Sequence, residues 1–273
     1  MKLEVVGIKI DNITKAQAVK TLDDFILGKS PKMITTVYSE FVVFSQTDSE
    51  YLNVLNNASL SLPDGMGIIW ASKYLSLPLS FKNRGLRVVQ AVWQLVYTLS
   101  AIIFNPKYIR SVIAEQISGS EFIFDICELA QEKNYSIAIF GGENNVAKIA
   151  AEVLKDKFPN LKINLSQSDK EFDSSAVSAI AQSNSDILII AYSPPKQEKW
   201  LYSNLQKLNI KACIGLGGTF DYLAKKRAYR PDFAHYIGLE WLWRLITQPF
   251  RLKRMWNAIP VFIWIVSKYK IKN

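Results

Sequence analysis

The chain of 273 residues contains one histidine, His235, and two cysteines, Cys127 and Cys213. A single histidine excludes metal sites built on several histidines, and the sequence contains neither an HExxH nor a CxxC pattern. Both cysteines lie in apolar, periodic stretches, which indicates buried small hydrophobes rather than a disulfide. Any catalysis must therefore depend on carboxylates, hydroxyls, Arg, Lys and backbone amides, and we expect neither a metal nor a cofactor.

Long apolar runs are also missing: none reaches the roughly 18 to 20 residues that a membrane-spanning helix needs. The run Val88–Phe104 comes nearest, but Gln90, Gln94 and Thr98 recur at every fourth position. On a helix they form one polar stripe, which favours a helix lying in the membrane interface. An ordinary core helix is the alternative. The N-terminal stretch MKLEVVGIKI is too short and too mixed for a secretory signal peptide, so we expect a protein bound peripherally to the cytoplasmic face of the cell membrane.

The first 224 residues carry no net charge, and the whole net charge of the chain lies in the remaining residues. Residues 225–273 contain eleven Lys and Arg and two acidic residues, which accounts for the formal net charge of +9. The same segment contains four of the seven tryptophans, Trp241, Trp243, Trp256 and Trp264. This mixture is typical of a surface that meets a membrane with acidic lipids. Nucleic acid is the competing partner, but no nucleic-acid motif accompanies the charge, so we expect none.

Short apolar runs alternate with amphipathic stretches, which predicts βαβ units and a mostly parallel sheet. The predicted strands are Met33–Val37, Ser59–Leu62, Ser136–Phe140, Leu161–Leu165, Asp186–Ala191 and Lys211–Leu216. We therefore expect a Rossmann-like α/β catalytic domain over 1–224, flanked by helices and carrying an apolar insertion at 78–114. A basic, membrane-proximal helical appendage over 225–273 follows. Ligands of such sheets bind at the carboxyl ends of the strands.

Two strand ends carry candidate chemistry. Asp64 lies in the strand-to-helix turn LPDGMG, where it is either a helix N-cap or a general base that faces the cleft. Gly217 and Gly218 follow the last predicted strand, and their backbone N–H groups suit a diphosphate. Neither turn matches a dinucleotide fingerprint or a P-loop.

Polar side chains elsewhere suggest further contacts. Gln197 opens a predicted helix and has the donor and acceptor groups that a nucleobase edge requires, although surface solvation is the alternative. Arg244, Arg251 and Arg254 are spaced seven and three residues apart, so on one helix they share a face that suits phosphate. Pro249 interrupts that stretch, and a solvated face is the alternative.

Taken together, these motifs resemble the WecG/TagA/CpsF glycosyltransferase family from about Ile8 to Arg254, outside the insertion. The stretches that carry the resemblance are TTVYSE (35–40), LPDGMGI (62–68), QISGSEF (116–122), FGG (140–142), SPPKQEKW (193–200), GLGGTFDYLA (215–224) and GLEWLWRLITQPFRLKR (238–254). The resemblance implies an inverting, metal-independent enzyme. Such an enzyme moves N-acetylmannosamine or its uronic acid from UDP to a sugar on undecaprenyl diphosphate, in cell-surface polysaccharide synthesis.

The resemblance also implies roles for particular residues. Asp64 matches the catalytic base, and Thr36 matches the hydroxyl beside it. Gln197 and Asp221 match nucleotide contacts. The three C-terminal arginines match residues that hold diphosphate. Because the acceptor is lipid-linked, we expect an anionic membrane surface as a further partner. The sequence leaves open whether the chain forms a homo-oligomer.

The sequence departs from the family pattern at several positions: Lys225 replaces the usual Gly, residues 229–231 replace the usual Arg-Ala-Pro, and three further departures lie within the motifs. Tyr38 replaces the usual Asn, Gln116 the usual Arg and Glu121 the usual Asp. A non-catalytic, membrane-associated adaptor that kept the fold is therefore the alternative function. Turnover of a UDP-sugar with a lipid-linked acceptor would separate the two.

Overall fold

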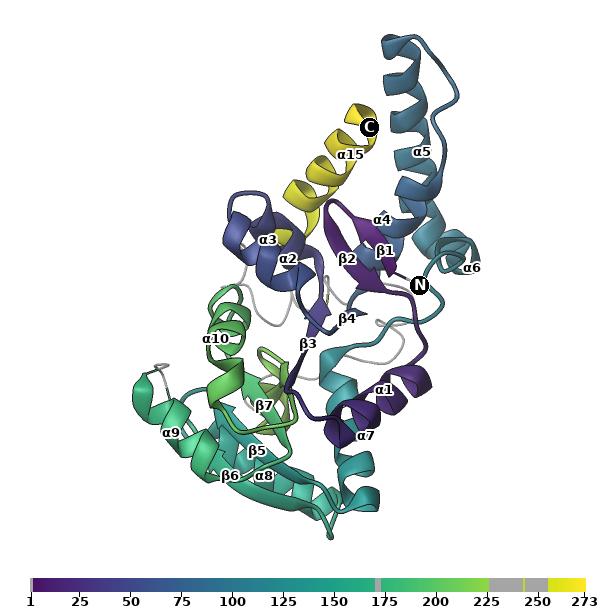
Figure 1. Cartoon of the computed structure of the whole chain (residues 1–273). Coiled ribbons are helices and arrows are strands. Elements are labelled where there is room, and N and C mark those ends of the chain that lie inside the picture. The colour runs from purple at the N-terminus through teal and green to yellow at the C-terminus, as the bar shows by residue number, and fades with distance from the viewer. Residues whose placement is uncertain (1, 170–172, 226–242, 244–254) are drawn as a thin grey trace.

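A parallel sheet of six strands organises the computed structural model, which describes residues 2–169, 173–225, 243 and 255–273 (Figure 1). The strands lie in the order β4-β3-β8-β7-β5-β6, and every pair is parallel. Their bounds are β3 (Lys32–Val37), β4 (Leu60–Pro63), β5 (Ser136–Gly141), β6 (Lys162–Gln167), β7 (Ile187–Ala191) and β8 (Ala212–Gly215). The predicted fold class is confirmed, and the six predicted strands are present within two residues of their predicted ends.

Helices cover both faces of the sheet because its inner strands are apolar on both sides. One face packs against α1 (Lys15–Leu27), α7 (Gly119–Lys133), α8 (Val146–Lys157) and α11 (Thr219–Leu223). The other packs against α3 (Ser49–Asn56), α9 (Ser174–Gln182) and α10 (Lys196–Asn204), which the short turn η1 (Leu205–Lys207) follows. Buried Cys127 and Cys213 belong to these two cores and form no disulfide, as the sequence predicted.

A second group of elements lies beside β3 and β4 and was only partly predicted from the sequence. It contains the antiparallel hairpin β1 (Lys2–Val5) and β2 (Ile8–Asp11), with α2 (Ser39–Ser45), α4 (Met66–Ser76), α5 (Arg84–Phe104) and α6 (Pro106–Ile109). The C-terminal turn η3 (Asn257–Val261) and helix α15 (Phe262–Lys272) pack into the same apolar core. The hairpin was not predicted: its two strands are four residues long, and unlike the fully buried four-residue strands β4 and β8 they alternate buried with exposed side chains.

The end of the chain is firmly attached to this group. Phe262 and Val266 of α15 are fully buried. Lys270 donates to the carbonyl oxygens of Tyr74 and Leu77 at the end of α4, and burial lowers its pKa to about 8. The last helix is therefore part of the folded body, whereas the division at residue 225 into two domains stays a prediction. Arg244, Arg251 and Arg254 lie outside the described residues.

Helix α5 is the part of the insertion whose environment differs most from the prediction. It begins at Arg84 and has 21 residues, so it is longer than the predicted apolar run. Among the described residues, α5 is the one helix whose length and composition suit a membrane crossing, and only 17% of its most apolar window is buried. The prediction that no segment is long enough to span a membrane was therefore wrong, because this helix is long enough. The alternative of an ordinary core helix is also wrong, because most of this window is exposed.

The polar stripe of α5 faces the protein. Gln90 and Gln94 each donate through Nε2 to the Pro78 carbonyl oxygen, at 3.3 and 3.0 Å. Thr98 Oγ1 accepts from the indole Nε1 of Trp70 at 3.0 Å. Thr98 thus joins α5 to α4 of the body, Gln90 and Gln94 join it to the start of the insertion, and the apolar side is left outside.

Candidate active site

One large cavity lies at the carboxyl ends of the strands. Its volume is about 830 Å³. Strand ends and glycine turns line one part of it with polar groups, from Thr36, Asp64, Ser118, Gly142, Gly217 and Asp221. Helices α4, α5 and α15 and the turn η3 line the other part with apolar side chains, including Met66, Leu99, Ile102, Ile259 and Phe262. The cavity therefore has a polar part and a larger apolar part, and it lies where an open α/β sheet binds its ligand.

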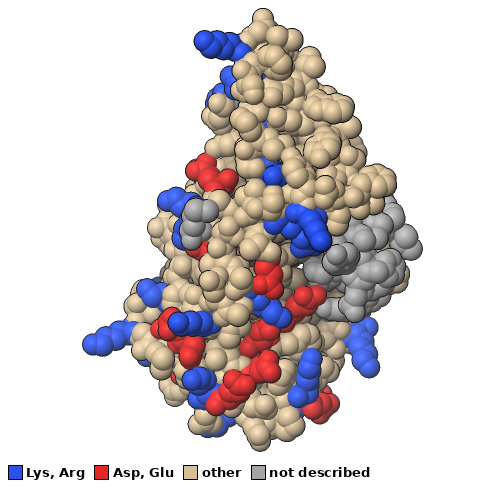
Figure 2. Space-filling view, turned by 90° about the vertical axis from the view of Figure 1, so that its right-hand side faces the viewer, with Lys and Arg blue, Asp and Glu red and all other residues tan. Residues whose placement is uncertain are grey.

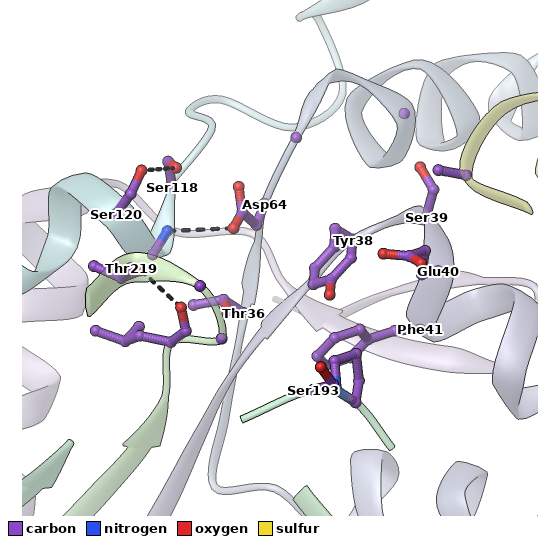
Figure 3. A pocket seen from close by; sticks show the side chains of 18 of the residues that line it. Thr36, Tyr38, Ser39, Glu40, Phe41, Asp64, Ser118, Ser120, Ser193 and Thr219 are labelled. Atoms are coloured by element: carbon purple, nitrogen blue, oxygen red, sulfur yellow. Dashed lines mark hydrogen bonds between the residues drawn. The ribbon is translucent and has the colours of Figure 1, made fainter. Parts of the chain in front are cut away.

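The strand register brings Thr36 and Asp64 together. Thr36 of β3 pairs with Leu62 of β4, so Asp64 follows two residues beyond the partner of Thr36, at the end of the neighbouring strand. Thr36 Oγ1 lies 3.5 Å from the carbonyl oxygen of Gly215 on β8, the strand on its other side. In Figure 3, the side chains of Thr36 and Asp64 lie around one space, with Tyr38 beyond them.

A backbone amide positions the Asp64 carboxylate. Gly119 N–H, at the start of α7, donates to Asp64 Oδ2 at 3.3 Å (Figure 3). Asp64 is not the N-cap of α4, which was the alternative role. The N-cap residue there is Gly65, and no side chain accepts a hydrogen bond from the first turn of the helix. Asp64 is thus only partly buried and lines the cavity, as a general base requires.

Gln197 joins two of the loops that line the cavity. Its Oε1 accepts from the backbone N–H groups of Tyr192 and Gly217, at 3.0 and 3.1 Å. Its Nε2 donates to Glu198 at 2.6 Å. The side chain reaches this place because residue 215 is glycine: a Cβ there would lie 2.1 Å from Gln197 Nε2. The amide of Gln197 is therefore engaged by the protein, and its contact with a nucleobase stays a prediction.

Glu198 is a buried carboxyl behind this arrangement. It is 1% exposed and accepts from Gln197 and from the Tyr51 hydroxyl, the latter at 3.2 Å. Burial raises the pKa of Glu198 to about 7, and it also raises the pKa of Tyr51. The carboxyl therefore changes charge near neutral pH at a position that supports Gln197, its neighbour on α10.

This buried carboxyl predicts that stability falls as pH rises. Because the folded-state pKa is above the usual 4.5, the folded state gains stability from the neutral carboxyl at low pH and loses it as pH rises through 7. The loss is on the order of 2–3 kcal/mol. We expect the unmodified protein to unfold at a lower denaturant concentration at pH 8 than at pH 5, and Glu198→Gln to lose most of that difference. Exposed Glu152→Gln is the control and should retain the pH dependence; identical curves for both variants would contradict the account.

Of the remaining predicted site residues, some lie in the part of the chain that the structure describes and others lie outside it. Gly217, Gly218 and Asp221 line the same cavity as Asp64 and Thr36, and Gly217 adopts a positive φ of 52° that favours glycine. Their contacts with a nucleotide stay predictions. The three arginines cannot be placed because they lie outside the described residues. No group of metal-binding side chains is found among the described residues, and metal independence also stays a prediction.

Sequence reasoning missed several groups at this site. Gly119 lies inside the stretch QISGSEF, and Glu198 lies inside the stretch SPPKQEKW. These two motifs were the features of the sequence that could have identified them. Of the three departures within the family motifs, Tyr38 and Gln116 line the cavity. Tyr38 packs against Phe41 with ring centroids 4.6 Å apart, and Gln116 Oε1 is shielded without a hydrogen bond among the described residues. They change the cavity wall beside Asp64.

An open parallel sheet with an aspartate, glycine turns and a large cavity at its strand ends is the arrangement of a ligand-binding α/β enzyme. The model of the glycosyl transferase WecG/TagA/CpsF family matches residues 3–105 and 100–273. The chain belongs to this family and is a glycosyltransferase. The two matched segments meet within α5, inside the insertion.

Curated relatives agree with the family. The N-acetylglucosaminyldiphosphoundecaprenol N-acetyl-beta-D-mannosaminyltransferase of Staphylococcus aureus strain MRSA252 is 24% identical over 275 residues, which cover 99% of this chain and 94% of that protein. The protein of the same name from strain NCTC 8325 / PS 47 has the same identity and coverage. The similarity therefore extends over the whole chain.

Proposed function

We propose that this glycosyltransferase moves an N-acetylhexosamine-type sugar from UDP to a sugar linked to undecaprenyl diphosphate, in cell-surface polysaccharide synthesis. The transferred sugar is N-acetylmannosamine or its uronic acid. The observation that carries the proposal is the cavity itself. It brings the Asp64 carboxylate and glycine-rich strand ends to one side and apolar helices to the other, which suits a polar sugar joined to a lipid. The name of the staphylococcal relatives describes the transfer of N-acetylmannosamine to N-acetylglucosaminyldiphosphoundecaprenol.

Asp64 acts as the general base in this proposal. Its carboxylate takes the proton of the acceptor hydroxyl, and the hydroxyl oxygen then bonds to the anomeric carbon of the donor sugar. The bond between that carbon and the UDP oxygen breaks on the opposite face, so the configuration inverts. A positioned base of this kind accelerates transfer by about 10²–10⁴-fold. The Thr36 hydroxyl lies beside this path and orients the acceptor.

The leaving UDP is held at the later strand ends. The turn at Gly217 and Gly218 brings the backbone close to the diphosphate, and Gly218 donates its N–H, since the Gly217 N–H is held by Gln197 Oε1. Asp221 at the start of α11 reaches the nucleoside. Gln197 fixes the loop that carries Gly217. Arg244, Arg251 and Arg254 complete the site by binding diphosphate, since a guanidinium pairs with two phosphate oxygens at once. Charge on the leaving group is then neutralised without a metal.

A direct assay tests the reaction. The purified protein is incubated with a panel of UDP-sugars and an acceptor of N-acetylglucosamine on a polyprenyl diphosphate, and the lipid-linked product is identified by mass spectrometry. We expect one UDP-N-acetylhexosamine to add a single sugar. UDP release that needs no acceptor, or no product with any donor, would contradict the proposal and favour the adaptor.

We also propose that the protein binds peripherally to the cytoplasmic face of the cell membrane through α5 and the C-terminal segment. The exposed face of α5 includes Val89, Val92, Trp93, Val96 and Phe104, and Trp256 and Trp264 are exposed near the end of the chain. On the side shown in Figure 2, uncharged atoms dominate the upper part of the molecule, where α5 lies, and acidic residues gather on the body below. Each Lys or Arg near an anionic surface adds about 1 kcal/mol.

Substituting exposed tryptophans should weaken membrane binding. We expect Trp93→Ser combined with Trp264→Ser to lower the fraction bound to vesicles of acidic phospholipid by several-fold, because both rings lose interfacial burial. Truncation at Pro260 is a poor test because it removes the buried Phe262 and Val266. Tyr202→Ser, at an exposed aromatic on α10, is the control. Sedimentation with vesicles measures the effect. Equal binding of the unmodified protein, the double variant and the control would contradict the proposal.

A further inference from the structure

The apolar part of the cavity is lined by different elements from the polar part. Its walls come from α4, from the insertion and from the C-terminal elements, not from strand ends. Leu99, Ile102 and Ile103 belong to α5, and Ile259 and Ile263 belong to η3 and α15. The insertion therefore contributes to the cavity wall as well as to the surface.

This apolar wall continues to the outside of the molecule. Ile103 lines the cavity and is also 52% exposed, and its neighbour Phe104 is 85% exposed. On the facing helix, Ile263 lines the cavity and the next residue, Trp264, is 60% exposed. α5 and α15 contact each other and project from the body on the same side (Figure 1). An apolar path thus leads from the space beside Asp64 to the surface proposed to meet the membrane.

We propose that this path binds the first isoprene units of a polyprenyl chain, whose diphosphate-linked sugar then reaches Asp64. The inference rests on the proposed function, because it assumes a lipid-linked acceptor. A sugar diphosphate needs polar surroundings, whereas the chain attached to it needs apolar ones, and the two parts of the cavity provide both in contact. The acceptor enters laterally from the bilayer between α5 and α15.

The physical role of such a groove is to fix position. Moving a chain from the bilayer into an apolar groove exchanges one apolar environment for another, so little affinity is gained from the membrane. The chain nevertheless stays out of water while its head group rises to the carboxylate. For an acceptor dissolved in water, each buried CH₂ should favour binding about 4-fold.

Acceptors of different chain length test the groove without a membrane. One carries N-acetylglucosamine diphosphate on a single isoprene unit, the other on three, and both are used below their aggregation limits. The unmodified protein should have a KM at least tenfold lower for the longer acceptor, with a similar kcat. In Ile103→Asn that preference should shrink about 5–10-fold, because a polar amide faces the chain.

Val89→Asn is the matched control. Val89 is 67% exposed on the same helix and is not part of the cavity wall, so it should weaken vesicle binding without changing the chain-length preference. Ile263→Asn probes the opposite wall and serves as the second variant if Ile103→Asn does not fold. An equal KM for both acceptors in the unmodified protein, or an unchanged preference in both wall variants, would overturn the groove.

Failure of the proposed function would look different. The unmodified protein would then turn over neither acceptor. Calorimetric binding of farnesyl diphosphate and dimethylallyl diphosphate would still decide the groove in that case, because a chain-length preference in binding needs no transfer.

Discussion

The Asp64→Asn variant is expected to lose about 10²–10⁴-fold in kcat. The substitution keeps the shape of the side chain and its acceptor for the Gly119 N–H, so the cavity wall should be preserved. It removes the ability to take a proton from the acceptor hydroxyl. Steady-state rates with saturating UDP-sugar and lipid acceptor measure the effect.

Donor binding separates this loss from a structural defect. UDP affinity of Asp64→Asn, measured by calorimetry, should stay within about twofold of the unmodified value because the proposed donor contacts include the turn after β8 and Asp221 on α11, away from Asp64 in the sequence. Thr36→Val is a useful companion, since it removes only the neighbouring hydroxyl and should cost less. Near-normal turnover of Asp64→Asn would exclude Asp64 as the base.

The Gln197→Ala variant is expected to lower UDP affinity by about 10–100-fold. Its Oε1 holds the backbone amides of Tyr192 and Gly217, and both loops line the cavity. Leaving a buried donor without its partner costs about 1–3 kcal/mol, so the loops should move to find other partners. Calorimetric titration with UDP measures the change.

Two further variants distinguish loop positioning from a direct contact. Tyr51→Phe removes a hydrogen bond to Glu198 but leaves the bonds of Gln197 to the loops, so UDP affinity should hardly change. Gly215→Ala retains Gln197 but places a Cβ 2.1 Å from its Nε2, so it should resemble Gln197→Ala. If Gly215→Ala bound UDP normally while Gln197→Ala did not, Gln197 would contact the nucleotide directly.

The strand ends show why part of the site could be predicted from sequence. Asp64 and the Gly217 turn each follow an apolar run, and parallel strands place their carboxyl ends on one edge. Local pattern and topology together were therefore enough to expect these groups in one cleft. The engagement of Gln197 was not predictable, because its partners lie 5 and 20 residues away in loops whose separation depends on the register of β7 and β8.

The C-terminal segment illustrates the opposite case. Its charge and its tryptophans are visible in the sequence and predict a membrane-facing surface. The same composition does not reveal that Phe262 and Val266 are core residues or that Lys270 caps α4. Those contacts join residues nearly 200 positions apart.

By itself, the sequence determined the alternation of strands and helices, the family and the residues available for chemistry, because these depend on local periodicity and short motifs. Only the tertiary structure decided which side of α5 is outside. The stripe of Gln90, Gln94 and Thr98 could face water, head groups or protein, and Pro78 and Trp70 supply the partners that turn it inward. The physical reason is that a polar group is satisfied by whichever partner the fold brings near, and helical spacing alone does not specify that partner.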